Sequence, residues 1–139
     1  MGPLRIFNYK NGVKTSVTLD ASGYATVADI LDMLFLGSSE ALKLLVNDAK
    51  IEDIKKTESA VEIQLEKETI FKSTEMGQYN VDKIFLPFTG DFVGNDKDPI
   101  ITVFAGDAKG YFSGPLRNPN GYAKLMELKA LLEAAAGPK

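Results

Sequence analysis

An Asn-Gly pair close to the N-terminus constrains the fold more than any other feature of the sequence. Asn11 and Gly12 separate two runs, residues 4–10 and 13–19, in which apolar and polar side chains largely alternate. Asn-Gly suits a type I′ turn, in which both central residues take a positive φ, and such a turn joins two antiparallel strands. The sequence therefore predicts a β-hairpin with the pairs Lys10–Val13, Asn8–Thr15, Ile6–Val17 and Leu4–Leu19.

This register divides the side chains of the hairpin between two faces. The first face is apolar and collects Leu4, Ile6, Val17 and Leu19. The second face is polar apart from two aromatic residues, Phe7 and Tyr9. An antiparallel sheet commonly buries one face and exposes the other, so these two rings need a cover, which is either the second half of the chain or another chain. Phe7 and Tyr9 are therefore candidate partner-binding residues.

An amphipathic helix is expected after the hairpin. Thr26 is a suitable N-cap, Asp29 lies near the positive end of the helix dipole, and Gly37 is placed to end the helix. The apolar residues between them have the spacing of one buried stripe: Val27, Ile30, Leu31, Leu34 and Phe35. A closing helix is expected from about Tyr122 to Ala136, with Leu125, Leu128, Leu132 and Ala135 on one side.

The stretch over residues 38–57 has two interpretations. In the first, Ser39 caps a helix that places Leu42, Leu45, Val46 and Ala49 on one face. In the second, residues 42–46 form a short buried strand, and Asn47-Asp48 is its turn. Both remain open, because periodicity does not separate a short buried strand from a helical segment.

Most of the remaining sequence predicts strands and loops. From Ala60 to Glu66, apolar residues alternate with Glu62, Gln64 and Glu66, so we expect a strand with one wet face and no catalytic meaning for its glutamates. Further strands are expected at residues 69–72, 81–86, 100–104 and 111–113. Loops are expected at residues 90–99 and 114–121, which are rich in glycine, proline and asparagine or aspartate.

The order hairpin, helix, apolar stretch and strand over residues 4–67 resembles a ubiquitin-like β-grasp domain. Leu44-Leu45-Val46-Asn47-Asp48, then Ile51 and Val61-Glu62-Ile63, are similar to the third strand, turn and last strand of its sulfur-carrier branch. The resemblance implies a binding scaffold. Conjugating and sulfur-carrying members end in Gly-Gly just past that strand, whereas this chain continues, so their chemistry is not implied. Residues 99–136 separately resemble the end of a thioredoxin fold, without the Cys-x-x-Cys of its redox members.

The whole sequence predicts an α+β fold. It consists of the N-terminal hairpin and helix, which are β-grasp-like, further antiparallel strands, and a C-terminal helix packed on the sheet. We expect residues 1–139 to form a single compact domain. The alternative is a sub-division into a β-grasp-like part, 1–67, and a ββα-like part, 68–139, with its junction near Lys67.

The composition argues against several classes of function. The chain contains no cysteine and no histidine, so it lacks disulfides, thiolate nucleophiles and the commonest general base and metal ligand. A net charge of −3 and a single adjacent basic pair, Lys55-Lys56, disfavour a nucleic-acid partner. No apolar run is long enough to span a membrane. We expect a cytoplasmic protein without a cofactor.

Three groups of residues are candidate sites. Arg117 lies in a loop between two prolines, and with Tyr111 and Tyr122 it is a candidate for binding a carboxylate or phosphate. Phe88 and Phe92 flank a glycine and are candidates for a partner-binding surface, although core packing at a strand end explains them somewhat better. Asp91, Asp96 and Asp98, with Asn95, are weak candidates for a calcium site, because their spacing does not match an EF-hand and turn formation explains them better.

These observations favour a non-enzymatic protein-binding or assembly module that acts through sheet and loop surfaces. Its partner is another protein or a second copy of the chain. The alternative is a small-molecule-binding or anion-binding domain, or an enzyme, that uses the loops around Arg117.

Overall fold

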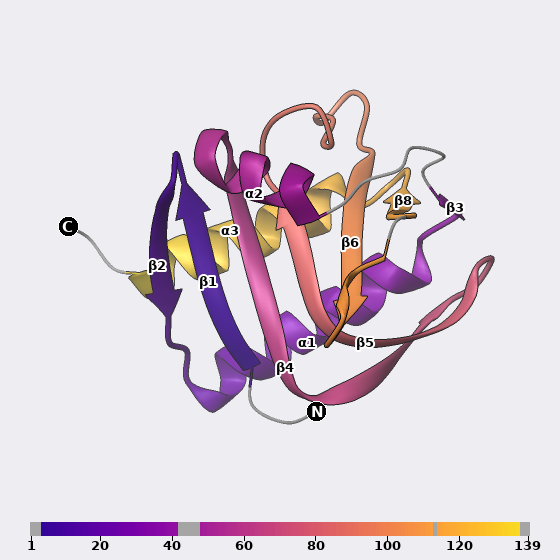
Figure 1. The fold of residues 1–139 in the computed structure, drawn as a ribbon, viewed down its shortest axis with the longest axis horizontal. Helices are drawn as coiled ribbons and strands as arrows, with labels where there is room; N and C mark the ends of the chain where they lie inside the picture. The colour runs from indigo at the N-terminus through magenta and orange to yellow at the C-terminus, as the bar shows by residue number, and fades with distance from the viewer. Residues whose placement is uncertain (1–3, 42–47, 113, 137–139) are drawn as a thin grey trace.

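The computed structural model describes residues 4–41, 48–112 and 114–136 and has an α+β fold (Figure 1). Its strands form an antiparallel sheet in the order β2-β1-β4-β5-β6-β8-β3, with β7 paired beside β6. The elements in chain order are β1 (Leu4–Lys10), β2 (Val13–Val17), α1 (Ala21–Leu36), β3 (Glu40–Ala41), α2 (Asp48–Thr57), β4 (Ser59–Ser73), β5 (Gly77–Pro87), β6 (Ile101–Asp107), β7 (Gly110–Tyr111), β8 (Leu116–Asn118) and α3 (Tyr122–Ala136).

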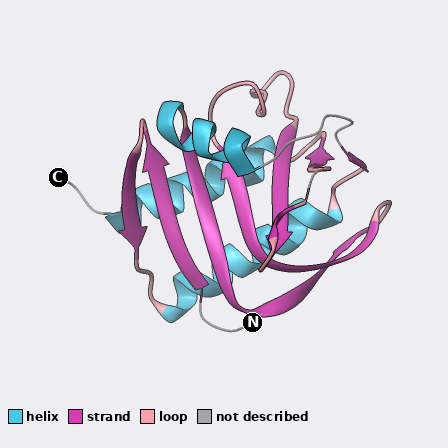
Figure 2. Ribbon diagram, viewed as in Figure 1, coloured by secondary structure: helices cyan, strands magenta, loops and turns pink. Residues whose placement is uncertain are grey.

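The helices lie on both faces of the sheet. The long helices α1 and α3 pack against one face, and the short helix α2 crosses the other (Figure 2). The predicted fold class is confirmed, including the C-terminal helix on the sheet. The predicted helix over residues 122–136 has the bounds of α3. Within the described residues, no helix is long and apolar enough to cross a bilayer.

The N-terminal hairpin has the predicted register. Lys10 pairs with Val13 and Ile6 with Val17, and the turn residues Asn11 and Gly12 have φ values of 51° and 86°. β2 ends at Val17, so the expected pair between Leu4 and Leu19 lies beyond the strand. β1 continues the sheet on its other side by pairing antiparallel with β4 along its whole length.

Helix α1 begins earlier than the sequence predicts. Asp20 is the N-cap, and its carboxylate accepts a hydrogen bond of 2.7 Å from the backbone N–H of Gly23. Thr26, the expected cap, lies inside the helix, where its hydroxyl donates to the carbonyl of Ser22. An aspartate satisfies the free amide groups of a first turn well, so the helix extends back to it. The predicted end at Gly37 is confirmed, as is burial of the stripe Val27, Ile30, Leu31, Leu34 and Phe35.

Strands β4 and β5 form a long hairpin that bends around the end of α1. Their register shifts between Gln64 and Thr69. Such an irregularity bends and twists a strand pair, and here it accompanies the turning of the outer hairpin toward α1. Phe71 then stacks on Phe35 with ring centroids 4.4 Å apart, and the Ser73 hydroxyl donates to the carbonyl of Ser38. β4 also runs without a break through Lys67, near which the alternative sub-division places its junction.

Three other expectations meet the structure as follows. The strands expected at residues 100–104 and 111–113 correspond to β6 and β7, which pair antiparallel; residue 113 lies outside the described residues. The expected loop over 114–121 contains the short strand β8, which pairs with β6. Glu40–Ala41 is strand β3 and the next helix begins at Asp48, so no helix starts at Ser39; residues 42–46, whose conformation was left open, lie outside the described residues.

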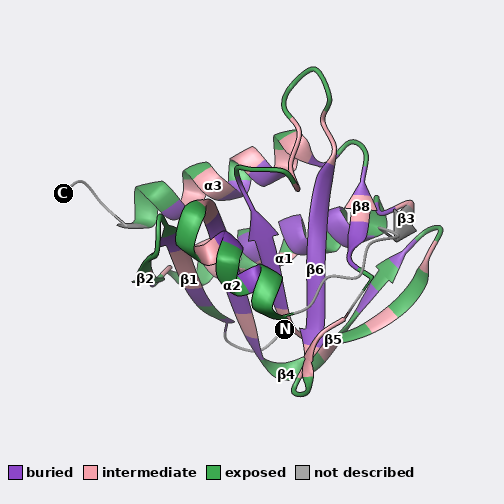
Figure 3. Cartoon of the chain, turned by 45° about the horizontal axis from the view of Figure 1, so that its top comes forward, coloured by how far each residue is buried: buried purple, intermediate pink, exposed green. Residues whose placement is uncertain are grey.

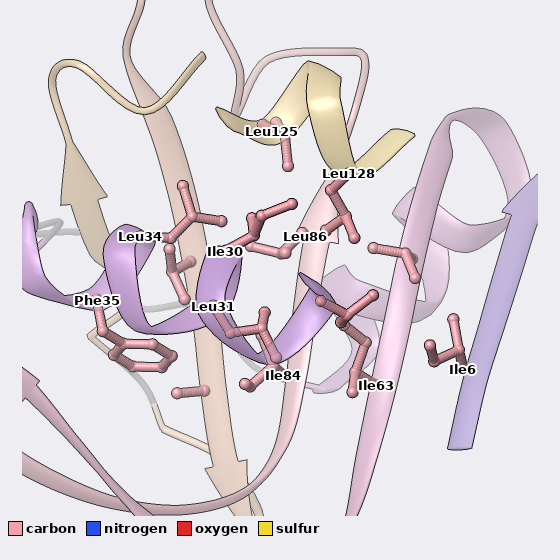
Figure 4. Packing of buried hydrophobic residues seen from close by; sticks show 14 of the residues in the cluster. Ile6, Ile30, Leu31, Leu34, Phe35, Ile63, Ile84, Leu86, Leu125 and Leu128 are labelled. Carbon is pink, nitrogen blue, oxygen red and sulfur yellow. The ribbon is translucent and has the colours of Figure 1, made fainter. Parts of the chain in front are cut away.

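The main hydrophobic core lies between the sheet and helices α1 and α3. Figure 4 shows Ile30, Leu31 and Leu34 of α1 directed toward β-strand residues such as Ile63 and Ile84. Leu125 and Leu128 of α3 close the core from the other helix. Residues from β1 through α3 contribute to this core, so the first described strand and the last described helix are packed together in it.

Candidate functional site

The face of the sheet under α2 carries a second, smaller buried cluster. Its apolar members are Ile51 and Ile54 of α2, Ala60 of β4, Phe85 of β5 and Phe104 of β6. Figure 3 shows that β6 is buried along nearly all its length. The centre of the sheet is therefore covered on both faces.

Glu62 of β4 lies within this second cluster. Its side chain is buried, with 6% of the residue exposed, and it has three neighbours that donate hydrogen bonds. The Tyr111 hydroxyl lies 2.6 Å from Oε2, and Lys55 Nζ lies 3.2 Å from Oε1. The Tyr9 hydroxyl is more distant, at 3.4 Å from Oε1. A buried carboxylate is expensive unless it is paired in this way.

Lys55 connects this carboxylate to α2. Its ammonium group also binds Glu52 at 2.9 Å and lies 4.9 Å from the centre of the Tyr9 ring. Burial lowers the pKa of Lys55, but hydrogen bonding to Glu52 and the charge of Glu62 outweigh it, so the pKa is raised overall. Lys55 is therefore held in its charged form beside Glu62.

Burial raises the pKa of Tyr111, and the negative charge of Glu62 raises it further. The phenol therefore stays protonated and acts as a hydrogen-bond donor to the carboxylate. Its backbone N–H also donates to Asp48 Oδ1 at 3.1 Å, at the start of α2. At the other end of α2, the backbone N–H of Gly12 donates to the carbonyl of Lys55 at 3.0 Å.

The arrangement fastens α2 to the sheet. The polar groups that have acid–base chemistry, Glu62, Lys55 and Tyr111, are directed at one another. Two expectations are corrected here. Glu62 was expected on a wet face and is buried, and the cover over Tyr9, which is 8% exposed, is α2 of the first half of the chain. Phe7 is only half-buried, with Lys14 Nζ 4.3 Å from its ring centre.

Sequence reasoning missed Glu62 and Lys55, although a signal for the second cluster was present. The runs around Ile84-Phe85-Leu86 and Val103-Phe104-Ala105 are apolar without alternation, which is typical of strands buried on both faces. If both faces of these strands are buried, Glu62, which pairs with Phe85 in the sheet, is buried too and needs a hydrogen-bond or ion-pair partner.

The three candidates for anion binding do not form one site. Tyr111 binds Glu62 on the α2 side, whereas Tyr122 begins α3 and packs against the main core. Arg117 lies in β8, in register with Thr102 of β6 and Glu40 of β3. Its Nε atom is buried and has no hydrogen-bond partner among the residues that the structure describes.

The aromatic and acidic candidates are also separated. Phe88 is buried in the main core at 6% exposure, and Phe92 packs edge-on against Phe104 in the cluster under α2. Phe92 is only partly buried and also lines a surface hollow beside α2, so its role in partner binding stays a prediction. The loop carboxylates of Asp91, Asp96 and Asp98 are exposed, and Asn95 Oδ1 accepts the backbone N–H groups of Lys97 and Asp98, which makes an Asx turn.

Two surface hollows lie on the α2 side. Of the described residues, Arg5, Gln64, Leu65 and Glu66 line the larger one, of about 410 Å³. The smaller, of about 130 Å³, runs beside α2 and is lined by residues that include Lys50, Asp53, Asp91 and Phe92. Neither is lined by Tyr111, Arg117 or Tyr122 among the residues that the structure describes.

The remaining candidate is the edge of the sheet at β2. Within the described part of the chain, β2 pairs only with β1. The residues next to a two-residue turn exchange backbone hydrogen bonds, so Val13 and Thr15 direct theirs to β1. Lys14 and Ser16 therefore direct their N–H and C=O groups away from the sheet. Beside them, Val13 is 65% exposed, the highest value among the large hydrophobic residues that the structure describes.

Comparisons with family models, curated proteins and solved structures find no match to this chain. The ubiquitin-like resemblance therefore stays a prediction.

Proposed function

We propose that the protein is a non-enzymatic binding or assembly module that adds an extended protein segment to the β2 edge of its sheet. The observation that carries the proposal is the outward direction of the backbone groups of Lys14 and Ser16 beside the exposed Val13. A strand with free N–H and C=O groups is a template for another strand. The expected cytoplasmic location is part of this proposal.

The edge is held in a fixed shape, which favours binding. Val17 anchors one end of β2 in the core with 4% exposure. At the other end, the Gly12 N–H bonds to the Lys55 carbonyl of α2, which the Glu62 cluster fastens to the sheet. An edge that is already extended loses little conformational entropy when a partner strand binds.

A proline substitution at Ser16 tests the proposal. Ser16→Pro removes an N–H that points away from the sheet, so the hairpin keeps its hydrogen bonds to β1. Ser16→Ala is the matched control, since it loses the hydroxyl but keeps the N–H. Both variants are first compared with the wild type by thermal melting.

The three proteins are then applied to an array of extended peptides with alternating β-branched and polar residues. We expect the wild type and Ser16→Ala to retain a common set of peptides and Ser16→Pro to lose it. Retention of the same peptides by all three folded proteins contradicts strand addition at β2, as does a wild type that neither retains a peptide nor associates with itself.

A second candidate function is anion binding at Arg117. It is favoured by the buried Nε, which has no hydrogen-bond partner within the described part of the chain, because an unpaired buried donor is costly and an oxyanion satisfies it. Titration of the wild type and Arg117→Gln with inorganic phosphate, followed by melting temperature at constant ionic strength, tests it. A phosphate-dependent rise in the wild type alone supports the site, and equal curves remove it.

A further inference from the structure

We infer that the segment that fits the β2 edge best is β2 of a second copy, paired antiparallel about a two-fold axis at Thr15. The inference rests on the proposed function and deepens it by naming the partner. It follows from the sequence of the strand, the direction of its side chains and the exposure of Val13.

The strand is nearly symmetric about its centre. Val13-Lys14-Thr15-Ser16-Val17 reads Val-x-Thr-x-Val in both directions. A two-fold axis at Thr15 places Val13 opposite Val17 of the second copy and Thr15 opposite its own equivalent. Lys14 then faces Ser16 of the second copy. Paired β-branched residues stabilise adjacent antiparallel strands, and this register provides them at every position on the core side.

The same register directs backbone groups toward one another. The N–H and C=O groups of Lys14 and Ser16 point away from β1. In this pairing Lys14 of each copy forms a hydrogen-bonded pair with Ser16 of the other copy, so one such pair lies on each side of the axis. Thr15 and its equivalent form the closely spaced pair between them. All five residues of β2 take part.

Neighbouring registers fit less well. An axis at Lys14 places two lysines directly opposite each other, which is destabilising. An axis at Ser16 pairs Lys14 with Thr18 and Val13 with Leu19, both of which lie beyond the end of β2. The charge of Lys14 therefore disfavours the register that places this residue opposite its own equivalent.

The last described turn of α3 lies next to the proposed contact. Figure 1 shows α3 ending beside β2, on the core side of the sheet. Ala134 and Ala135 in its last turn are exposed and small. A two-fold axis through Thr15 brings the two α3 ends together on that side. Because β2 is short, the contact is small, and we expect a reversible dimer that depends on protein concentration.

Charge substitutions at Ser16 test the register. In the Thr15-centred pairing, Ser16→Glu faces Lys14 of the second copy twice, so the dimer should tighten by about fivefold at low salt. Ser16→Lys faces the same lysine and should weaken it by a similar factor. If the axis lay at Ser16, Ser16→Glu would face itself and weaken the dimer. Sedimentation equilibrium measures all three proteins.

Lysine substitutions at two exposed apolar residues test whether the contact lies at β2. Val13→Lys places a charge against Val17 of the second copy and should weaken the dimer by at least about tenfold. Ile70 is also an exposed strand residue, at 56%, but it lies on the β4–β5 hairpin. Ile70→Lys should leave the dimer unchanged. Equal effects of the two substitutions contradict the inference.

A single cysteine gives the most direct readout, because the chain contains none. Directly opposite residues of a closely spaced antiparallel pair lie within disulfide distance. Oxidised Thr15→Cys should therefore form a covalent dimer, whereas Val13→Cys and Ser16→Cys should not. Each variant is checked for folding by melting temperature.

The outcomes separate the inference from the proposed function. A monomeric wild type with uncrosslinked Thr15→Cys overturns self-pairing, but peptide capture lost in Ser16→Pro would still uphold strand addition at β2. If the chain neither dimerises nor captures a peptide at this edge, both proposals fall. Crosslinking of Ser16→Cys in place of Thr15→Cys overturns the register.

Discussion

Replacement of Glu62 by alanine is expected to loosen α2 from the sheet. Glu62→Ala leaves the buried Tyr111 hydroxyl without its acceptor at 2.6 Å and Lys55 without its buried partner at 3.2 Å. Removing one partner of a buried ion pair costs about 3–5 kcal/mol. Lys55 keeps Glu52 as a partner, and its side chain is 13% exposed, so we expect a loss of about 3 kcal/mol, near the lower end.

This free energy converts into a measurable change in melting temperature. For a chain of this size, about 3 kcal/mol lowers the melting temperature by roughly 10 °C. Glu66→Ala is the matched control, because Glu66 lies on the same strand and is exposed; it should change stability by less than about 0.5 kcal/mol. Thermal and urea unfolding followed by circular dichroism measure both variants. Equal stability of Glu62→Ala and the wild type would refute the role assigned to Glu62.

Three further predictions concern the same framework. The pKa values of Tyr111 and Lys55 are raised in the folded state, so from about pH 10 upward the folded protein keeps protons that the unfolded chain loses. The free energy of unfolding should therefore fall above that pH, and it should fall less steeply in Tyr111→Phe. Urea midpoints measured between pH 8 and 11 test this. Phe35→Ala and Phe71→Ala should each cost about 3–5 kcal/mol, with a coupling of about 1 kcal/mol in a double-mutant cycle; additive losses would contradict the stacking. Asn118→Ala removes a buried side-chain donor to the last turn of α1 and should cost about 1–3 kcal/mol in urea unfolding, whereas a change under about 0.5 kcal/mol would show that this bond is dispensable.

Sequence reasoning succeeded where the determinants are local. The Asn11-Gly12 turn sets the register of its hairpin through two residues that accept a positive φ. The α1 stripe from Val27 to Phe35 follows from helical periodicity, and its burial needs only a sheet to pack on. The end of α1 at Gly37 is equally local.

The failures have a different origin, because they depend on residues far apart in the chain. Glu62 and Glu66 lie on the same face of β4, and α2 covers this face at Glu62 but leaves Glu66 exposed. The alternation of apolar and polar residues alone therefore does not distinguish the two glutamates. Strand β8 forms because three residues of a proline-bounded loop pair with β6. The composition of the loop does not predict this pairing. The start of α1 was missed because Thr26 and Asp20 are both good caps, and the earlier one prevails.

The candidate site shows the same division. The hairpin register alone predicts that the backbone N–H and C=O groups of Lys14 and Ser16 point away from β1. That β2 has no second strand neighbour among the described residues is known only from the strand order of the whole sheet. The grouping of Arg117 with Tyr111 and Tyr122 relied on closeness in sequence. The sheet separates them, since Tyr111 and Tyr122 pack on opposite sides of it.

Amide hydrogen exchange at β2, measured over a range of protein concentrations, tests the central claim most directly. The amides of Val13 and Thr15 point to β1 and should be protected at every concentration, whereas those of Lys14 and Ser16 should exchange fast in dilute protein. Strand pairing between copies predicts that Lys14 and Ser16 become protected as the concentration rises, and that Ser16→Pro abolishes this for Lys14. Fast exchange of both amides at all concentrations would contradict pairing between copies.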